Sequence, residues 1–310
     1  MKILVTGSKG MIGSHLVKGL LEAGYEVVGL DRICNQSCDG RYFHYVVDLA
    51  DKDTLQFIME KYKPDRVIHL AALAHAADGK KITWEDYKHL NVDCAKNIFE
   101  VAGDIPVLFI RTVDVYGFTK GTVNVNTPMK PVSNYGRSKM MAEQEVRKKR
   151  YFDIFRFSPV YTDTVKRDIQ KRYYLKYPNI AYQIGKGTEY EILNVNVAVQ
   201  AMVDWCSEKP KNTVRIIKDT KRMWTPDYIK AEKAKGRAKI VLRVPTWMMN
   251  CGYAVLRKIT GENKYTYLLN KAVHPLRSEK IDGLEGSSAG KAYFDARRIC
   301  KTEFAIHERV

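Results

Sequence analysis

This 310-residue sequence lacks long apolar runs and paired cysteines, and it has fewer acidic than basic residues, with 35 Asp and Glu against 52 Lys and Arg. No apolar stretch reaches the roughly 20 residues of a membrane-spanning helix, and the short apolar run at the N-terminus leads into glycines rather than a signal-peptide cleavage site. The six cysteines are scattered, without a pair at the spacing of a zinc site. We therefore expect no membrane span, no metal site, and reduced thiols in a cytoplasmic protein.

The excess of basic over acidic residues lies almost entirely in the second half of the chain. Residues 1–140 contain 18 Lys and Arg against 16 Asp and Glu, whereas residues 141–310 contain 34 against 19. This excess fits an anionic substrate, a nucleic acid or an anionic membrane surface, or it is a solvated basic face without a specific partner. Because the sequence contains no recognised nucleic-acid-binding module, we expect no nucleic-acid partner.

Short apolar runs alternate with helical segments over the first 157 residues. We expect strands at residues 3–5, 26–30, 42–47, 66–70, 107–111 and 153–157. Helices are expected between them, at residues 11–23, 51–62, 83–102 and 133–150. This alternation predicts an α/β fold with a doubly wound parallel sheet that carries helices on both faces.

Three glycines follow the first apolar run at fixed spacing. Gly7, Gly10 and Gly13 lie between the strand at residues 3–5 and a helix that Gly24 is placed to stop. Glycines at this spacing also occur in ordinary turns. In a strand, turn and helix they are typical of a dinucleotide site, because they permit a tight turn and close approach of a pyrophosphate. The positive N-terminal end of the helix then binds the phosphates.

An acidic residue follows the second expected strand. Asp31 stands 18 residues after Gly13, where a carboxylate accepts both ribose hydroxyls of NAD and repels the 2′-phosphate of NADP. The neighbouring Arg32 could tolerate that phosphate. We expect NAD, with NADP as the less favoured cofactor.

A tyrosine and a lysine four residues apart lie near the start of the helix expected at residues 133–150. Tyr135 and Lys139 share one face of that helix. A free tyrosine has a pKa of about 10 and is a poor base at neutral pH, but a nearby ammonium favours the phenolate and lowers that pKa. Tyr135 could then take a proton from a substrate hydroxyl. Thr112, at the end of the fifth strand, could hydrogen-bond the reacting oxygen.

The second half of the chain is less regular. We expect strands at residues 213–217 and 240–244, and helices at residues 195–207, 225–236 and 246–260. Residues 244–259 could touch a membrane or a lipid-linked enzyme, but Gly, Asn and Cys interrupt the apolar face, so we favour a core-facing helix.

Two domains follow from this pattern. We assign residues 1–157 and about 191–224 to a dinucleotide-binding domain. We assign about 158–190 and 225–310 to a smaller substrate-binding domain over the carboxyl edge of the sheet, where open α/β sheets bind ligands.

Further short segments accompany the glycine turn and the Tyr135–Lys139 pair. They are Asp48-Leu49, His69-Leu70-Ala71-Ala72, Asn91-Val92, Val115-Tyr116-Gly117 after Thr112, Arg156-Phe157-Ser158-Pro159-Val160 and Phe294-Asp295-Ala296-Arg297-Arg298. As a set, these motifs resemble the extended short-chain dehydrogenase/reductases of the NAD-dependent epimerase/dehydratase type. The resemblance covers the first 160 residues well and the rest loosely.

The resemblance implies a Rossmann fold and a role for each matched residue. It implies a pyrophosphate on Gly7, Gly10, Met11, Ile12 and Gly13, a ribose beside Asp31 and Arg32, and an adenine beside Asp48 and Leu49. It implies a cofactor lining of Leu70, Ala71 and Ala72, a nicotinamide ribose on Lys139, and a nicotinamide beside Pro159 and Val160. The family usually handles nucleotide-diphosphate sugars. Many members dimerise through helices matching residues 83–102 and 133–150, so we expect a homodimer.

Several residues depart from the family pattern. Val113 stands where 4,6-dehydratases of the family carry an acid, which disfavours dehydration and leaves 4-epimerisation or keto reduction. Glu189 stands where many epimerases carry an arginine for the substrate diphosphate, and a carboxylate there would repel it. The basic residues that could replace this arginine are Arg172, Lys186, Arg222 and Arg243. Asp114 and Ser158 are the expected substrate contacts.

We therefore predict a nucleotide-sugar 4-epimerase with Tyr135 as base, Thr112 steadying the C4 oxygen and Lys139 tuning Tyr135. A keto-sugar reductase would use the same residues. The chain could instead be a basic nucleic-acid-binding relative or a non-catalytic NAD-binding relative, but the intact catalytic set disfavours both.

Overall fold

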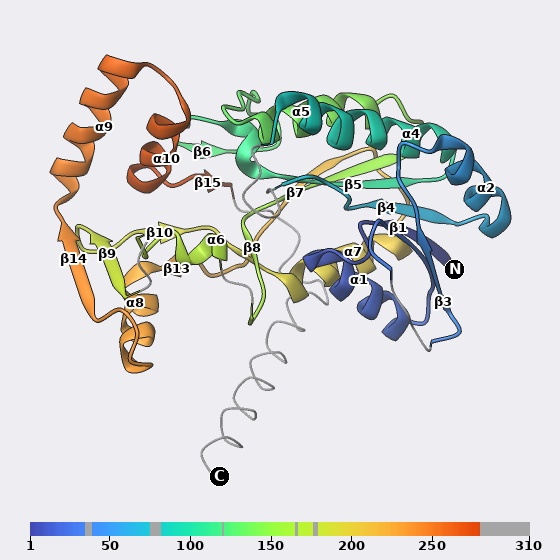
Figure 1. Cartoon of the computed structure of the whole chain (residues 1–310), viewed down its shortest axis with the longest axis horizontal. Helices are drawn as coiled ribbons and strands as arrows, with labels where there is room; N and C mark the ends of the chain where they lie inside the picture. Colours follow the sequence, from blue (N-terminus) through green and yellow to red (C-terminus); the bar gives the residue numbers. More distant parts are fainter. Residues whose placement is uncertain (35–38, 75–81, 120, 165–166, 176–178, 280–310) are drawn as a thin grey trace, which may run out of the picture.

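The computed structural model describes residues 1–34, 39–74, 82–119, 121–164, 167–175 and 179–279. Seven strands form one all-parallel sheet, and their order across it is β12-β7-β5-β4-β1-β2-β3 (Figure 1). The strands are β1 (Lys2–Thr6), β2 (Glu26–Asp31), β3 (Tyr42–Val46), β4 (Arg66–His69), β5 (Val107–Thr112), β7 (Phe152–Phe157) and β12 (Val214–Ile217). Each overlaps one of the expected strands to within one residue at either end, and β1 extends the expected run at both ends.

Helices cover both faces of this sheet (Figure 1). One face packs against α1 (Met11–Glu22) and α7 (Val195–Ser207), with buried Leu16 and Met202 in a shared core. The other face packs against α2 (Lys52–Tyr62), α4 (Cys94–Val101) and α5 (Asn134–Val146), with buried Ile58 and Ile98 in a second core. The predicted doubly wound α/β fold is therefore confirmed.

The helix expected at residues 83–102 has three parts. It begins as α3 (Trp84–Lys88), widens into a π-helical turn (His89–Asp93) and continues as α4. Thr83 begins it with a capping box, because its side chain accepts from Asp86 N while the Asp86 carboxylate accepts from Thr83 N. The wide turn is a feature that apolar periodicity does not reveal.

The remaining elements are short and lie beside the main sheet. β9 (Ile180–Ile184) pairs in parallel with β14 (Ile240–Val244), and α8 (Thr225–Ala234) lies next to them. Two-residue strands form the other pairs: β10 (Glu189–Tyr190) with β13 (Met223–Trp224), β11 (Leu193–Asn194) with β8 (Val160–Tyr161), and β15 (Arg277–Ser278) with β6 (Thr122–Val123). A turn of helix, α6 (Arg167–Gln170), completes this region. The division into two domains stays a prediction.

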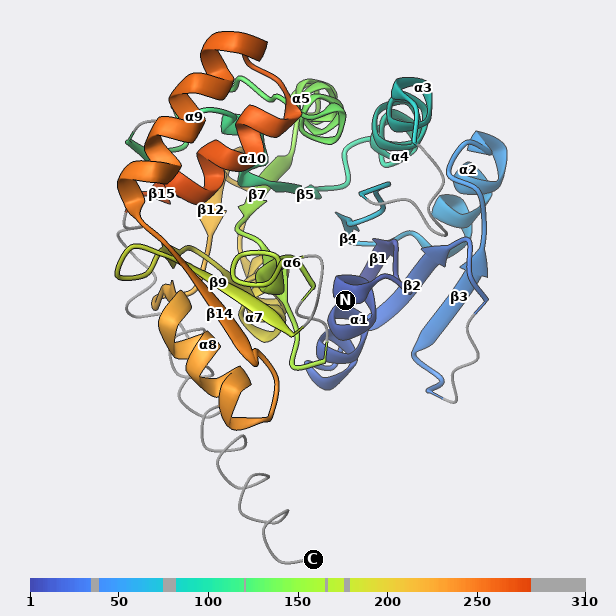
Figure 2. The ribbon, with the colours of Figure 1, turned by 60° about the vertical axis from the view of Figure 1, so that its left-hand side comes forward.

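The helix expected at residues 246–260 forms, but its predicted burial is wrong. α9 (Thr246–Thr260) contains no buried residue. It lies at the edge of the molecule and packs against α10 (Lys264–Val273), as Figures 1 and 2 show. The partly buried face of α9 is narrow, with Met249, Tyr253 and Leu256. Its other apolar residues therefore face outward instead of entering a core.

Candidate active site

The glycine turn joins β1 to α1 tightly. Gly7 has a φ of +70°, and a Cβ at Gly13 would lie 2.0 Å from the Gly7 carbonyl oxygen, so neither position accepts a side chain without displacement. Gly10 caps α1 without a side-chain hydrogen bond, and the first turn of the helix holds no acidic residue. The first amides of α1 and its positive end are thus available to an anion, which fits a pyrophosphate.

Asp31 ends β2 directly beside this turn. Its carboxylate accepts hydrogen bonds from the backbone amides of Lys9, at 2.9 Å, and Ile33, at 3.1 Å. These bonds fix the carboxylate while leaving lone pairs for further donors, as two ribose hydroxyls require. Arg32 is exposed next to it. The chain's residues therefore fit a dinucleotide here.

The expected adenine and cofactor-lining residues lie at neighbouring strand ends. Asp48 is exposed and accepts from Ala50 N at 2.9 Å, while Leu49 is partly buried against the core of the second sheet face. Leu70 and Ala71 follow β4 and are also partly buried. Ala71 N donates to Thr6 Oγ1 at 3.2 Å, which holds the end of β4 beside the end of β1.

His69 is a structural residue at the end of β4. It is fully buried, its Nδ1 lies 2.8 Å from Thr6 Oγ1, and its ring stacks on Phe109. Burial, aided by the charge of Lys139, lowers the pKa of His69 to about 3. The imidazole is therefore neutral and positions the strand end.

Lys139 lies inside the protein, next to β5. Its side chain is buried, and its Nζ donates to the Ile110 carbonyl oxygen at 3.2 Å and lies 5.0 Å from the centre of the Phe109 ring. Burial first, and the charge of Arg111 second, lower the pKa of Lys139 to about 7. Its amine is thus partly protonated near neutral pH, whereas an exposed lysine is fully protonated there.

Tyr135 lies one helical turn before Lys139, in the first turn of α5. Ser133 caps this helix by accepting from Gly136 N at 2.9 Å. Tyr135 is half-buried, with its ring centre 6.4 Å from that of Tyr87. Thr112, at the end of β5, accepts from Asp114 N at 3.2 Å and caps the following 3₁₀ turn, Val113–Tyr116. The three expected catalytic residues thus stand at the adjoining ends of β5 and α5.

Asn91 is a positioning residue to which sequence reasoning gave no role. From the π-helical turn, its amide donates to Ser138 Oγ at 2.9 Å and accepts from Leu73 N at 2.7 Å. Ser138 donates in turn to the Tyr135 carbonyl oxygen at 2.9 Å. This chain links the segment after β4 to the helix that carries Tyr135 and Lys139. The signal was present, since Asn91 belongs to one of the matched motifs.

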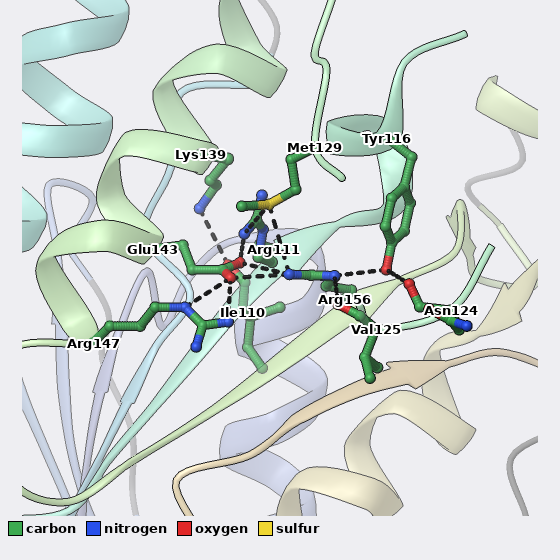
Figure 3. A network of polar contacts seen from close by, with 10 residues as sticks. All are labelled: Ile110, Arg111, Tyr116, Asn124, Val125, Met129, Lys139, Glu143, Arg147 and Arg156. Carbon is green, nitrogen blue, oxygen red and sulfur yellow. Dashed lines mark hydrogen bonds and ion pairs between the residues drawn. The ribbon is translucent and has the colours of Figure 1, made fainter. Parts of the chain in front are cut away.

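A buried charge cluster also anchors α5 to the sheet (Figure 3). Glu143, one turn beyond Lys139, has a fully buried side chain and forms ion pairs with Arg111 of β5 and Arg156 of β7. Arg156 also donates to Tyr116 Oη at 2.6 Å. Burial and the nearby charge of Arg156 move the pKa of Arg111 well below its ordinary value. Sequence reasoning missed this cluster because its members are far apart along the chain.

A cleft opens beside the 3₁₀ turn that follows Thr112. Its walls include Asp114, Ser158 and Pro159 from the sheet side, and Lys271 from α10. Lys271 Nζ lies 2.5 Å from the Asp114 carboxylate. The buried Ser158 Oγ has no hydrogen-bond partner among the described residues, so a ligand could supply one. Two expected substrate contacts therefore line the same cleft.

The structure separates the basic residues that could replace the missing arginine. Arg172 lines the cleft, with its guanidinium 4.6 Å from the centre of the Tyr190 ring. Arg222 instead lies 3.3 Å from the carboxylate of Glu189, which also accepts from Arg277 at 3.0 Å. Two cations thus offset the charge of Glu189, which reduces the repulsion expected from it. Arg243 is exposed on β14.

In the described part of the chain, no group of three or more His, Cys, Asp or Glu side chains could hold a metal ion, and no helix is long and apolar enough to span a membrane. The matched motif at residues 294–298 lies outside the described residues.

Comparison with known proteins gives one family. A model of the NAD dependent epimerase/dehydratase family matches residues 3–207. A UDP-glucose 4-epimerase from Neisseria meningitidis serogroup C is 35% identical over 159 residues, and one from Bacillus subtilis is 30% identical over 161 residues. The first alignment covers 46% of this chain and 46% of the relative, and the second covers 47% of each. The matched segment thus spans less than half the length of these relatives.

Solved structures share the fold. A UDP-Glc/GlcNAc 4-epimerase from Campylobacter jejuni superposes with a TM-score of 0.67 at 19% identity, over 88% of this chain and 97% of that one. An NAD complex of a UDP-glucuronic acid 4-epimerase from Bacillus cereus superposes with a TM-score of 0.63 at 23% identity, over 79% of this chain and 88% of that one.

Proposed function

Because the chain belongs to the NAD dependent epimerase/dehydratase family, we propose that it is an NAD-dependent 4-epimerase of a nucleotide-diphosphate sugar. The observation that carries this proposal is the geometry of α5. It holds Tyr135 and the buried Lys139 on one face, at the end of β5 where Thr112 stands. The named activities of the relatives support it.

Each residue has a distinct task in this mechanism. Tyr135, as phenolate, accepts the proton of the C4 hydroxyl, and the ammonium form of Lys139 lowers the pKa of that phenol. Thr112 donates a hydrogen bond to the C4 oxygen and steadies it. When bound, NAD supplies a reversible hydride acceptor for C4. Asp31, the glycine turn and the free amides of α1 hold it, and Asp31 favours NAD over NADP.

The cleft suits the substrate. Arg172 and Lys271, the latter paired with Asp114, bring two cations to its wall that can bind a diphosphate, and Ser158 offers a hydroxyl to the sugar. The absence of an acid at Val113 leaves no general acid for sugar dehydration by the family's route. Many family epimerases bind the substrate diphosphate with an arginine at the position of Glu189. We assign that contact to Arg172 in this chain.

The test is interconversion of UDP-glucose and UDP-galactose, and of their N-acetyl analogues, by the purified protein without added NADH. An epimerase reaches equilibrium without consuming NADH, whereas a keto-sugar reductase oxidises one NADH for each product molecule. Tyr135→Phe should lower kcat by about 10²–10⁴-fold while NAD binding persists, because one hydroxyl is lost from the reacting centre. The matched control is Tyr87→Phe, which removes a hydroxyl from the ring that neighbours Tyr135 and should keep activity. Equal kcat values for Tyr135→Phe and the wild type would contradict the mechanism.

We further infer that the protein is a homodimer in a reducing compartment. We place the homodimer contact on the helices at residues 83–102 and 133–150, which lie side by side on one face of the sheet (Figure 1). The described cysteines, Cys34, Cys94, Cys206 and Cys251, are all free thiols, which suits a reducing compartment such as the cytoplasm. Sedimentation velocity at two protein concentrations tests the dimer.

A further inference from the structure

Large apolar side chains gather on the outside of one part of the protein. Among the described residues, fifteen large hydrophobic side chains are exposed, and eight of them lie between residues 240 and 268. They belong to β14, α9 and α10, which form one edge of the molecule in Figure 1 and come forward in Figure 2. Single exposed apolar side chains are ordinary, but such a concentration marks an interaction surface.

The centre of this surface is one side of α9. Met248, Val255 and Ile259 stand seven and four residues apart and so lie along one line of the helix. Their exposed fractions are 47%, 56% and 76%, and the neighbouring Trp247 is 68% exposed. We call these four residues the α9 stripe. The partly buried apolar residues of α9, Met249, Tyr253 and Leu256, lie on another side of the helix.

Basic residues flank the α9 stripe along the chain. Residues 230–258 contain eight Lys and Arg and a single acid, Glu232. Lys239, Arg243 and Lys258 are exposed, and Lys258 lies on α9 itself. A helix with a tryptophan and aliphatic residues on one side and cations at its edges is typical of helices that lie in the headgroup region of an anionic bilayer. A second copy of the chain is a poorer occupant, because it would bring two basic segments together.

We propose that the α9 stripe docks the protein on the surface of an anionic membrane. Its four apolar residues would enter the boundary between headgroups and acyl chains, while Lys239, Arg243 and Lys258 would meet lipid phosphates. Contact is peripheral, in keeping with the lack of a spanning helix among the described residues. This docking does not depend on the proposed catalytic function. It does hold the cleft near the bilayer, since α10 lines the cleft and packs against α9.

The experiment is co-sedimentation of the full-length protein with vesicles of phosphatidylcholine alone or with 30–40% phosphatidylglycerol, at low and high salt. We expect the partition coefficient for the anionic vesicles to be at least about tenfold higher, and to fall with salt. Val255→Asp/Ile259→Asp should lower it at least about tenfold, and Arg243→Glu/Lys258→Glu should do so as well. The matched control is Phe57→Asp, at a side chain of α2 that is 57% exposed, and it should leave binding unchanged.

Circular dichroism and bound NAD verify that each variant is folded, so lost binding reports the surface. Absence of vesicle binding by the wild type would overturn the proposal, as would equal binding to neutral and anionic vesicles, or full binding by Val255→Asp/Ile259→Asp. A concentration-dependent dimer that Val255→Asp/Ile259→Asp dissociates, without vesicle binding, would identify a second copy as the occupant and also overturn it.

Discussion

Glu143 is the residue on which two buried guanidinium groups depend. Its carboxylate is fully buried, as are the side chains of Arg111 and Arg156 that pair with it. Removing one member of such a cluster leaves uncompensated charge in a medium where charge is poorly solvated. Because Glu143 stands one turn after Lys139, the cluster also fixes the helix that carries the expected catalytic pair.

We expect Glu143→Gln to lower the free energy of unfolding by about 3–5 kcal/mol, because both buried arginines lose their counter-charge. Urea denaturation followed by circular dichroism measures the change. The matched control is Glu145→Gln on the same helix, which pairs with the exposed Lys148 and should cost less than about 1 kcal/mol. Equal losses for the two variants would show that the buried cluster is not a stability determinant.

Asp219 is a buried carboxylate outside the catalytic set. It accepts from Asn194 N at 2.8 Å and from Tyr161 Oη at 3.2 Å, and burial raises its pKa from 3.8 to about 6. Between these two values the folded state binds a proton that the unfolded state has released. The charged form therefore costs folding free energy, and that cost disappears as the pH falls from about 6 to about 4.

Asp219→Asn should remove this dependence. At pH 7 the variant should gain as much as about 1–3 kcal/mol relative to the wild type, and this advantage should shrink as the pH approaches 4. Thermal or urea unfolding of both proteins at half-unit pH intervals gives the difference. A difference that stays constant from pH 4 to pH 7 would mean that Asp219 does not titrate in this window.

At the scale of elements, the loop between β1 and α1 depends on glycine, because a side chain at Gly7 or Gly13 would collide with backbone atoms. The sequence alone predicts this loop, because its three glycines stand between an apolar strand and a periodic helix. The contact between Gly13 and the Gly7 carbonyl oxygen gives the physical reason for one of them. Other elements resist prediction: β10, β11 and β13 contain two residues each, too few for any alternation to appear.

Gly13→Ala and Gly252→Ala should have opposite effects, although both glycines lie inside helices. The methyl group added in Gly13→Ala would meet a backbone oxygen, so α1 must shift, with an expected loss of about 1–3 kcal/mol and of NAD binding. Gly252 in α9 has no atom within 4 Å of the added methyl group, so alanine should gain about 0.5–1 kcal/mol. Urea denaturation and NAD titration measure both effects, and loss of stability in both would contradict the steric argument.

Helix α9 shows where pattern reading fails. Its apolar residues predict a helix correctly, but hydrophobicity alone does not say whether the apolar side meets a core or the exterior. α10 was missed although its first turn carries a readable signal. Asn263 accepts from the amides of Tyr265 and Thr266, while Thr266 accepts from Asn263 N, which forms a capping box.

At the scale of the molecule, sequence reasoning predicts the sheet well and the cleft poorly. The sheet is built from consecutive local units, and each reads as a strand or helix by itself. The cleft joins residues far apart in the chain: Asp114 and Lys271, which form an ion pair in its wall, are separated by 157 positions. Arg172 could be proposed as a phosphate-binding residue from its charge, but only the fold distinguishes it from Arg222, which pairs with Glu189.

The Asp114–Lys271 pair therefore tests whether the cleft serves binding or only holds α10 against the sheet. Both side chains are partly exposed, at 31% and 22%, so their pairing should contribute no more than about 1 kcal/mol to folding. Lys271→Gln should consequently leave the unfolding free energy within that limit while raising KM for the nucleotide sugar about tenfold or more, because a cation near the diphosphate is lost. Lys52→Gln, which breaks the surface pair with Glu100, is the control. It should change the unfolding free energy by no more than about 1 kcal/mol and leave KM unchanged. An unchanged KM for Lys271→Gln would assign the pair to structure alone, and the diphosphate would then have to rest on Arg172.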